Sequence, residues 1–335
     1  MPGSDAEVVV VGASAGGVEA LRKLARALPP DFGAPVLVVL HVPSSGSVLP
    51  QILDRAGPLR ARHAEDGEPL EPGCIYVAPP NCHLILEDGV ASLNRGPREN
   101  GHRPAIDPLF RTAAAAYGPR AAGVILSGAL DDGTVGLFAI KQAGGATLVQ
   151  DPEEALYPSM PSHAISYVQP DYVQSVNDIA DTLVRLTTAS TRDQPKEAVM
   201  TIDAAPNPSA EDAQPGELTP FSCPDCGGSL WEVDVGDVSS FGCRVGHAYS
   251  INSLVDKEAE AVERALWTAY RALEERAAIS RRVARRLAES GRHDSSGRFE
   301  RQADASAHQA DELKRILDLI EEAPEIESEE LAQAG

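Results

Sequence analysis

The first 190 residues predict an α/β domain with a doubly wound, mostly parallel sheet. Short apolar runs recur through this part of the chain, and several are continuous, such as VVVV from Val8 and VLVVL from Val36. Continuous runs are typical of strands that are buried on both faces of a parallel sheet. Turns and helical patterns follow many of these runs, and this alternation is typical of doubly wound folds.

The predicted strands and helices alternate along the domain. Strands are expected at residues 8–11, 35–40, 74–78, 122–127, 146–150 and 172–176. Helices are expected at residues 17–28, 108–117, 133–143 and 178–187. A second pair of short strands, IYVAPP and HLILEDGVASL, has the spacing of an antiparallel hairpin beside the sheet and close to the expected active site.

The composition changes after residue 190, and four further segments are predicted. Residues 191–220 are rich in Pro, Ala and acidic residues, which is typical of a linker. Residues 221–250 hold three of the five cysteines and are expected to form a small zinc-ribbon-like module. Residues 251–323 are expected to form an α-helical hairpin, and residues 324–335 a disordered tail.

Apolar residues spaced by three and four define the expected hairpin, because this spacing places them on one face of each helix. The first stripe comprises Val255, Ala259, Val262, Leu266, Tyr270, Leu273 and Ala277. The second stripe comprises Phe299, Ala303, Ser306, Ala310, Leu313, Leu317 and Ile320.

The charge balance excludes some classes of partner. The chain has 29 Lys and Arg against 50 Asp and Glu, a net charge of −21. Phosphate backbones and anionic membranes are therefore repelled, and no nucleic acid partner is expected. No run reaches the roughly 18 to 20 apolar residues that cross a bilayer, so no membrane insertion is expected. Five cysteines fit a reducing compartment, and we predict a soluble, cytoplasmic protein.

The segment Gly12–Gly16 matches G-x-S-x-G, in which a serine nucleophile lies on a sharp turn between a strand and a helix. The glycines relieve crowding in the turn, and the following helix start offers N–H groups to an oxyanion. The alternatives are a phosphate-binding loop and an ordinary tight turn. The segment lacks the Lys-Ser/Thr of a P-loop and the glycine spacing of the dinucleotide motif, so only its glycine content favours a nucleotide.

A nucleophilic serine needs a base and an orienting acid, and the carboxyl ends of parallel strands meet at one edge of a sheet. His41 directly follows PVLVVL, and Asp131 and Asp132 follow AAGVILSGAL. The order Ser, His, Asp differs from the Ser, Asp, His order of the α/β-hydrolases and argues against that fold. Four other histidines have no equally clear buried strand before them: His63, His83, His102 and His163.

Six segments occur in the order VVVVGASAGGVEAL, LHVP, YVAPPNCHLIL, HRPAIDPLF, ILSGALDDGTVGL and GGATLVQDPEEALYPSMPSHAI. Together they make residues 6–186 resemble the protein-glutamate methylesterases of bacterial chemotaxis, the CheB type. In that family the serine of G-A-S-x-G-G, the histidine of H-x-P and the aspartate before glycine in G-x-x-x-D-G form the catalytic triad. The resemblance implies these roles for Ser14, His41 and Asp132.

The resemblance also implies a reaction, which is acyl transfer without a catalytic cofactor. Ser14 would attack the γ-carbonyl of a glutamate methyl ester, His41 would carry the proton to departing methanol, and Asp132 would hold the imidazole. The implied partners are methylated chemoreceptor-like proteins, with other chemosensory proteins reached through the C-terminal module and glutamine deamidation as a side activity. The alternative is a catalytically silent adaptor, and the intact triad positions favour the enzyme.

The chain departs from the usual pattern of this family in three ways. Ala15 stands where many members have threonine, and Ala129 stands where the motif T-G-M-G-x-D-G has methionine. A backbone N–H donor survives both changes, whereas the side-chain packing differs. Typical members begin with a receiver domain that is phosphorylated on aspartate. Only seven residues precede Val8, so we expect that this form of control is absent.

A Cys-containing motif predicts a structural zinc site. Cys223 and Cys226 form a C-x2-C pair, and sixteen residues later Cys243 and His247 form a C-x3-H pair. Two close pairs with four ligands fit a closed tetrahedral site, and the glycines after Cys226 suit a tight knuckle. The alternative is a set of buried free thiols. The remaining two cysteines flank predicted strands and are expected in the core: Cys74 and Cys82.

Overall fold

The structure is a computed structural model that describes residues 6–42, 46–87, 89–188, 216–235 and 238–322. Two compact units divide the chain, Met1–Leu254 and Val255–Gly335. Among the helices that the structure describes, none has the length and apolar character needed to cross a membrane.

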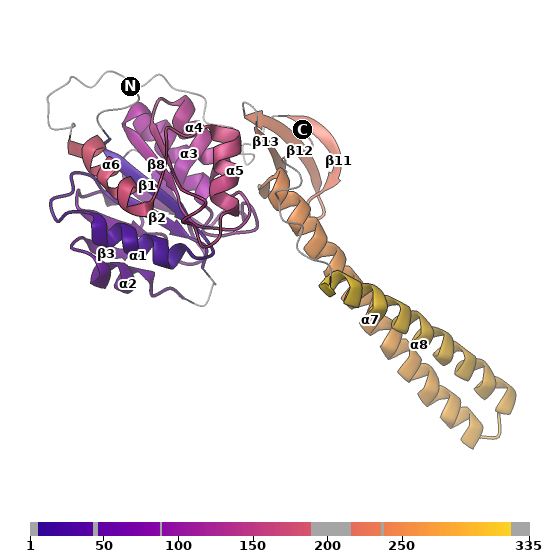
Figure 1. Ribbon diagram of the computed structural model, residues 1–335. Coiled ribbons are helices and arrows are strands. Elements are labelled where there is room, and N and C mark those ends of the chain that lie inside the picture. The colour runs from indigo at the N-terminus through magenta and orange to yellow at the C-terminus, as the bar shows by residue number, and fades with distance from the viewer. Residues whose placement is uncertain (1–5, 43–45, 88, 189–215, 236–237, 323–335) are drawn as a thin grey trace. The chain divides into compact units, whose positions relative to one another are not determined.

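A seven-stranded sheet lies at the centre of the first unit (Figure 1). Its strands are β1 (Val8–Ala13), β2 (Val36–Leu40), β3 (Arg60–His63), β5 (Cys74–Val77), β8 (Ala121–Ile125), β9 (Ala146–Gln150) and β10 (Tyr172–Gln174). Their order in the sheet is β10-β9-β8-β1-β2-β5-β3, and all neighbouring strands are parallel. The predicted doubly wound, parallel fold is therefore confirmed.

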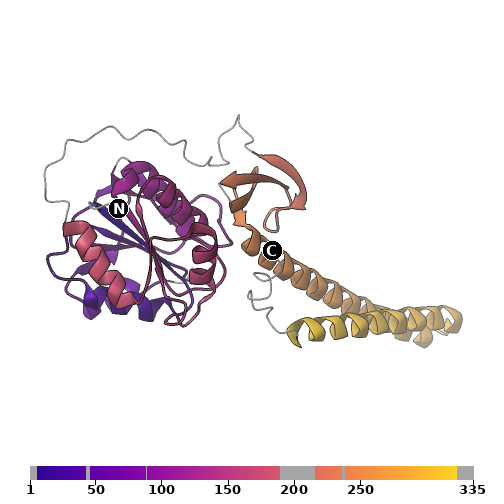
Figure 2. The same cartoon turned by 45° about the horizontal axis from the view of Figure 1, so that its top comes forward.

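Helices cover both faces of this sheet (Figure 2). One face packs against α1 (Gly17–Ala27), α2 (Leu49–Ala56) and α6 (Val176–Thr188), and the other against α3 (Ile106–Tyr117), α4 (Thr134–Gln142) and α5 (Ser159–Val168). A 3₁₀ turn, Gly118–Arg120, leads from α3 into β8. In β1, Val9 and Val11 face the first layer and Val8 and Val10 face the second, all fully buried. This burial explains the unbroken valine run, since neither face of β1 meets water.

The expected β-hairpin exists, but the prediction of its partners is wrong. A separate antiparallel sheet contains β4 (Glu68–Pro69), β6 (His83–Glu87) and β7 (Val90–Asn94). Both strands of the hairpin come from HLILEDGVASL and the next residue, Asn94, and Gly89 in the turn has a φ of 81°. The segment IYVAPP instead contributes to β5, which pairs in parallel with β2 and β3. A buried parallel strand and a hairpin strand share the same short apolar pattern, so the sequence does not separate them.

Four strands and α-helices of the domain were not predicted, namely β3, β4, α2 and α5. The strand β3 reads RARH and lies at the edge of the sheet, where its exposed and half-buried side chains leave no apolar run. Both helices are short and have proline in their first turn. Proline is tolerated in a first helical turn, although in a sequence it signals a break.

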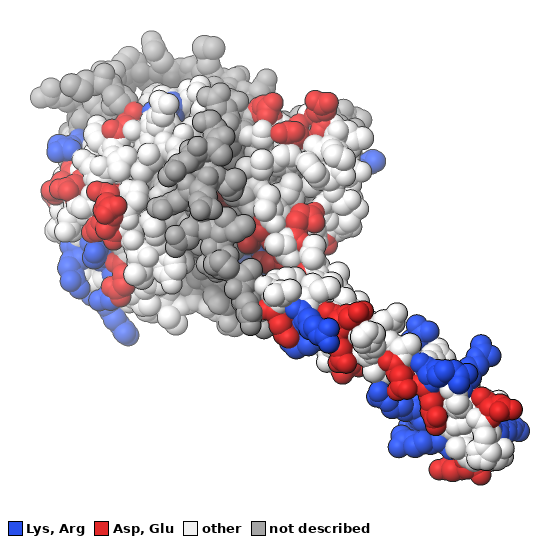
Figure 3. Space-filling view, turned by 45° about the vertical axis from the view of Figure 1, so that its right-hand side comes forward, with Lys and Arg blue, Asp and Glu red and all other residues white. Residues whose placement is uncertain are grey.

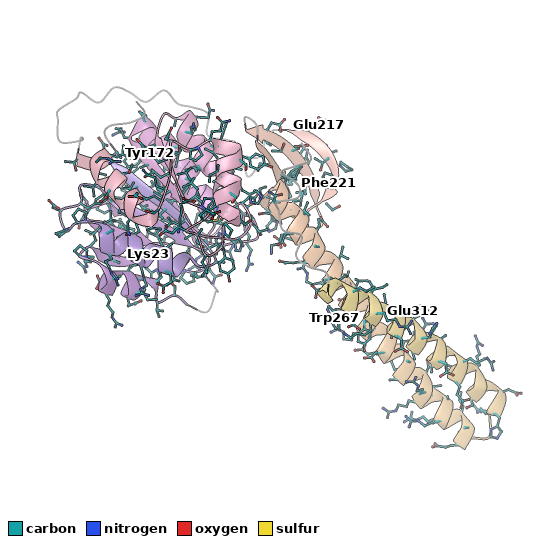
Figure 4. The ribbon with its side chains drawn as sticks, viewed as in Figure 1. Lys23, Tyr172, Glu217, Phe221, Trp267 and Glu312 are labelled. Carbon is teal, nitrogen blue, oxygen red and sulfur yellow. The ribbon has the colours of Figure 1, made fainter. Side chains whose placement is uncertain are left out.

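A small antiparallel sheet follows, and we call residues 217–250 the Cys/His module. It contains β11 (Glu217–Ser222), β12 (Ser229–Val235), β13 (Val238–Cys243) and β14 (Ala248–Ser250), and Figure 4 labels Glu217 and Phe221 on β11. The predicted linker, residues 191–220, lies largely outside the described residues. It is wrong for residues 217–220, which belong to β11 because Glu217 and Leu218 pair with β12.

Two long helices, α7 (Ile251–Glu289) and α8 (His293–Glu322), form the predicted hairpin, most of which belongs to the second unit. Small side chains fill the seam between them, among them Ala277, Ala284, Ala303 and Ala310. The first stripe is wrong at its start, where Val255 and Val262 are exposed. The described part of α8 has 30 residues and α7 has 39, so α8 is too short to cover the first turns of α7. The predicted tail, residues 324–335, lies outside the described residues.

The outer surface of the hairpin carries interspersed charges of both signs (Figure 3). Ion pairs join residues one turn apart on the same helix, such as Glu260 with Arg264 at 3.3 Å and Lys314 with Asp318 at 2.6 Å. The Lys314 ammonium also lies 4.9 Å from the ring centre of Trp267, in the stretch labelled by Trp267 and Glu312 in Figure 4. Such contacts are typical of a solvated helical surface, and here they surround a narrow apolar seam.

The close seam predicts a large penalty for a bulky side chain at its centre. Ala303→Leu should lower the stability of the hairpin by about 1 to 3 kcal/mol, because overpacking forces the two helices apart. Urea-dependent hydrogen exchange of the α8 amides in the full chain would measure the change. The exposed Ala305→Leu is the matched control and should leave exchange unchanged. Equal protection in both variants would contradict the packing described.

Candidate functional site

Ser14 lies in the turn that joins β1 to α1, close to the end of β8. Its backbone N–H donates to the carbonyl of Ser127 at 3.0 Å. Gly16 has a φ of 71°, and a Cβ there would lie 2.6 Å from Ser127 Oγ and 2.9 Å from Leu156 Cβ. Only glycine fits this position without displacing a neighbour. The glycines of the motif therefore create the space in which the turn can approach the neighbouring strand.

Three adjacent strand ends bring the predicted residues together. In the sheet, β1 lies between β2 and β8, and the chain builds outward from β1 first on one side and then on the other. This reversal is a topological switch point, where loops from neighbouring strands diverge and leave a crevice. Ser14 follows β1, His41 follows β2 and Asp132 lies in the loop after β8.

The three side chains form one hydrogen-bonded chain. His41 Nδ1 lies 2.9 Å from Ser14 Oγ, and His41 Nε2 lies 2.7 Å from Asp132 Oδ2. A carboxylate can only accept, so Nε2 carries the proton and Nδ1 is left to accept from the serine. The serine proteases use the two ring nitrogens the other way round, with Nε2 facing the serine. The chemistry available is the same, because either nitrogen of a neutral imidazole can act as the base.

Asp132 is held as a buried anion. Burial alone raises the pKa of this carboxyl, but the hydrogen bond and charge of His41 and the N–H of Ile106 hold the pKa well below its usual range. The backbone N–H of Ile106 donates to Oδ2 at 2.7 Å, and that of Asp107 approaches Oδ1 at 3.3 Å. Both N–H groups belong to the first turn of α3, where the helix dipole favours a negative charge. Asp132 therefore stays ionised beside the imidazole.

Two neighbours of this chain were missed by the sequence analysis. The ring of His102 stacks on that of His41, with centroids 3.6 Å apart and planes 8° apart. Asn100 is buried, and its Nδ2 donates to Asp132 Oδ1 at 2.8 Å. Neither residue follows a strand of the main sheet, so strand-end reasoning passes over both. Their one signal in the sequence is that they lie within six residues before α3, whose first turn donates to Asp132.

The other histidines that the sequence analysis considered contact backbone carbonyls. His83 Nε2 lies 2.8 Å from the carbonyl of Pro97, and burial lowers the pKa of His83. His63 lies 3.3 Å from the carbonyls of Val77 and Ser47, and His163 lies 3.1 Å from that of Leu130. These contacts fit structural roles in loops and strand ends.

The predicted metal ligands also come together. The ligand atoms of Cys223, Cys226, Cys243 and His247 all lie within 4.8 Å of one another. Cys226 Sγ lies 3.6 Å from Cys243 Sγ, and His247 Nδ1 lies 3.5 Å from Cys243 Sγ and 3.6 Å from Cys223 Sγ. Tetrahedral zinc with Zn–S bonds of about 2.3 Å places two sulfurs about 3.8 Å apart. The spacing of this Cys₃His cluster therefore fits a zinc ion.

Two tight turns hold these ligands. In the first, the N–H of Gly227 donates to the carbonyl of Cys223 at 2.8 Å; in the second, the N–H of Gly246 donates to that of Cys243 at 2.9 Å. Both glycines have positive φ angles, 71° and 101°, which other residues adopt only with strain. Cys82 is buried, as predicted for a core position, whereas Cys74 is half-buried and packs against the edge of the core.

Comparisons with known proteins match the first part of the chain. The family model described as CheB methylesterase matches residues 9–183, just over half of the chain. A putative protein-glutamate methylesterase/protein-glutamine glutaminase of Leptospira interrogans is 42% identical over 182 residues, which cover 54% of this chain and 94% of the relative. Protein-glutamate methylesterase/protein-glutamine glutaminase 2 of Anaeromyxobacter dehalogenans is also 42% identical, over 54% of this chain and 53% of the relative.

A solved structure matches the same share of the chain. It is the crystal structure of the Thermotoga maritima CheB methylesterase catalytic domain, which superposes with a TM-score of 0.52 at 35% sequence identity. The match covers 54% of this chain and 99% of the solved chain.

The depressed pKa of Asp132 predicts a pH-dependent contribution to stability. Its folded pKa lies below its unfolded pKa of about 3.9, so the stabilisation is present above that pH and is lost as the pH falls. Asp132→Asn should remove this loss, which amounts to at most about 1.4 kcal/mol per pH unit. Urea-dependent hydrogen exchange of β1 and β2 amides at pH 6 and pH 3 would measure it. The exposed Asp181→Asn is the control, and equal pH dependence in all three proteins would contradict the prediction.

Proposed function

Because this chain belongs to the CheB methylesterase family, we propose that Ser14, His41 and Asp132 are the catalytic triad of a protein-glutamate methylesterase. The observation that carries the proposal is the hydrogen-bonded chain from Ser14 Oγ through His41 to Asp132. The substrate would be a glutamate γ-methyl ester on a chemoreceptor-like protein, and the products glutamate and methanol. Chemotaxis-type signal transduction is the setting that this substrate implies.

The reaction begins at Ser14. Its Oγ attacks the ester carbonyl carbon while His41 Nδ1 accepts the hydroxyl proton, giving a tetrahedral oxyanion. The oxyanion collapses as His41 returns the proton to the leaving methoxide, and methanol departs from a glutamyl ester of Ser14. Water, deprotonated by the same nitrogen, then attacks that ester and releases glutamate and free serine. Asp132 keeps the Nε2–H tautomer throughout and stabilises the imidazolium that forms in each half.

The oxyanion needs donors that are in place before the reaction. We assign this role to backbone N–H groups at the start of α1, directly after Ser14, where the positive end of the helix dipole lies. Loss of one such donor costs other hydrolases about 10²- to 10³-fold in kcat. Backbone donors do not depend on side-chain identity, so Ala15 in place of threonine leaves this function intact.

The same centre suits hydrolysis of a glutamine side-chain amide, since the acyl group is the same and ammonia leaves in place of methanol. The names of two relatives include this activity, and we propose it as a second reaction of the chain.

A silent adaptor is not favoured, because an adaptor has no need of a hydrogen-bonded triad. We place the enzyme in the cytoplasm, where free thiols stay reduced. We expect other chemosensory proteins to contact the C-terminal part of the chain, where the start of α7 exposes Val255 and Val262.

We also propose that the Cys/His module binds one structural zinc ion. All four ligands come from the protein, which leaves no open position for a substrate or a reactive water. The Tyr249 hydroxyl donates its one proton to Asp225 at 2.6 Å, and at 3.5 Å from Cys223 Sγ it packs against this ligand. The module has a small core, centred on Leu230 and Phe241, and a metal would supply much of its stability.

Methanol release from a methylated chemoreceptor would test the enzyme. The native protein should release methanol, and Ser14→Ala should lower kcat by at least about 10⁴-fold, because no other group replaces the nucleophile. Ser166→Ala, at an exposed position on α5, is the matched control and should keep full activity. Release that survives in Ser14→Ala, or no release from the native protein, would overturn the proposal.

Metal analysis would test the zinc site. The purified chain should contain one zinc per molecule, and the double variant Cys223→Ser, Cys226→Ser should contain none because two of the four ligands are lost. Cys74→Ser is the control and should keep its zinc. Hydrogen exchange of β12 and β13 should rise in the double variant. A native protein that is metal-free and equally protected would contradict the site.

A further inference from the structure

Asn100 occupies a position that links the Cys/His module to the triad. Its side chain is 3% exposed and its φ is 51°, a left-handed conformation that asparagine tolerates better than most residues. The backbone N–H of Asn100 donates to the carbonyl of Ala248 in β14 at 2.7 Å. Its side-chain Oδ1 accepts from the backbone N–H of Ser250, also in β14, at 2.8 Å. Strand β14 therefore forms hydrogen bonds with both the backbone and the side chain of Asn100.

The other end of the same side chain serves two buried carboxyl groups, and burial and the charge of Asp132 raise the pKa of the second, Asp107. Asn100 Nδ2 donates to Asp132 Oδ1 at 2.8 Å and to Asp107 Oδ2 at 2.9 Å. The two hydrogens of one amide thus meet two acceptors, while the amide oxygen meets an N–H. The Ser250 N–H can only donate and the two carboxyl oxygens accept, so all three contacts favour the same orientation of the amide, with Nδ2 toward Asp132. The contact with Ser250 holds the opposite end of the amide, so β14 and Asp132 fix the side chain between them.

The neighbouring residue Asp131 provides a second attachment. Its Oδ1 accepts from Ser250 Oγ at 2.5 Å and from Ser253 Oγ at 2.9 Å, and its Oδ2 accepts from Asn252 Nδ2 at 3.1 Å. Asp131 is buried, so these hydroxyl and amide groups replace the water that its charge would otherwise bind. Residues 250–253 therefore bind the loop that carries Asp132 directly, as well as through Asn100.

We propose that Asn100 is a positioning residue for Asp132, and that β14 of the Cys/His module fixes Asn100 in its working orientation. This inference rests on the proposed function, because it assigns Asp132 its role beside His41. Asn100 holds one carboxylate oxygen while His41 binds the other, so the carboxylate plane stays aligned with the Nε2–H bond. The module then helps to position Asp132, in addition to any separate role that it has.

Steady-state kinetics of Asn100→Ala on a methylated chemoreceptor would test this role. Loss of a hydrogen bond to a charged group costs about 1.5 to 3 kcal/mol, so kcat should fall by about 10- to 100-fold while KM stays nearly constant. The acid limb of the kcat/KM profile should move to higher pH, because a carboxylate with one donor fewer holds a protonated imidazole more strongly. Asn177→Ala, at an exposed position on α6, is the control and should change neither quantity.

Two further measurements separate positioning from folding. A serine-directed fluorophosphonate would count active sites, and kcat would be expressed per reactive serine. The proton NMR signal of the His41 Nε2–H···Asp132 bond should shift in Asn100→Ala, whether or not the substrate has been identified correctly. If Asn100→Ala keeps native kcat per site, native pH profile and native NMR signal, the positioning role is wrong. If the native protein is inactive but the NMR signal still shifts in Asn100→Ala, the proposed function is wrong and the positioning role stands.

Ser250→Ala tests the module without touching the triad or Asn100. It removes one hydroxyl from Asp131 and should lower kcat by about threefold or more, since a buried hydrogen bond to a charge is lost. Ser166→Ala is again the control. Where Asn100→Ala does not fold, this variant still tests the attachment of residues 250–253 to the loop that carries Asp132. Native kcat and a native NMR signal in Ser250→Ala would show that the contact with Asp131 does not act on Asp132, and this second attachment would be discarded.

Discussion

The rest of the site depends on the burial of one negative charge. Asp132 is 1% exposed, and an ion so far from water is stable only where other groups replace its hydration. The first turn of α3 supplies two N–H groups, His41 supplies a third and Asn100 a fourth. These four donors come from three different parts of the fold. The need to satisfy this carboxylate therefore fixes the loop after β8, the start of α3 and the imidazole relative to one another.

Much of the scaffold around that charge could be predicted from local patterns. The apolar runs of β1, β2 and β8 mark strands that are buried on both faces, and residues directly after such strands must meet at one sheet edge. That reasoning reaches Ser14 and His41, but it does not separate Asp131 from Asp132, which follow the same run. The family pattern selected Asp132. In the structure the two carboxylates face different partners, the imidazole on one side and residues 250–253 on the other.

What could not be predicted depends on contacts between distant segments. Asn100 and His102 belong to a loop whose conformation is set by β14, almost 150 residues later, and no local periodicity records that contact. The hairpin error has the same origin, because IYV would serve equally well as a hairpin strand until β2 pairs with it. The start of α7 is a third case. Its apolar stripe is helical and regular, but the length of α8 decides which part of it is covered.

Consecutive residues of an extended or turning chain point their side chains in different directions. Asp131 and Asp132 therefore contact different partners, although they are neighbours in the chain. A shift of the loop that improved the contact of Asp131 with Ser250 would move Asp132 against His41, because one peptide unit joins them. Burial makes both contacts stiff, since either carboxylate loses its only replacement for water if it moves.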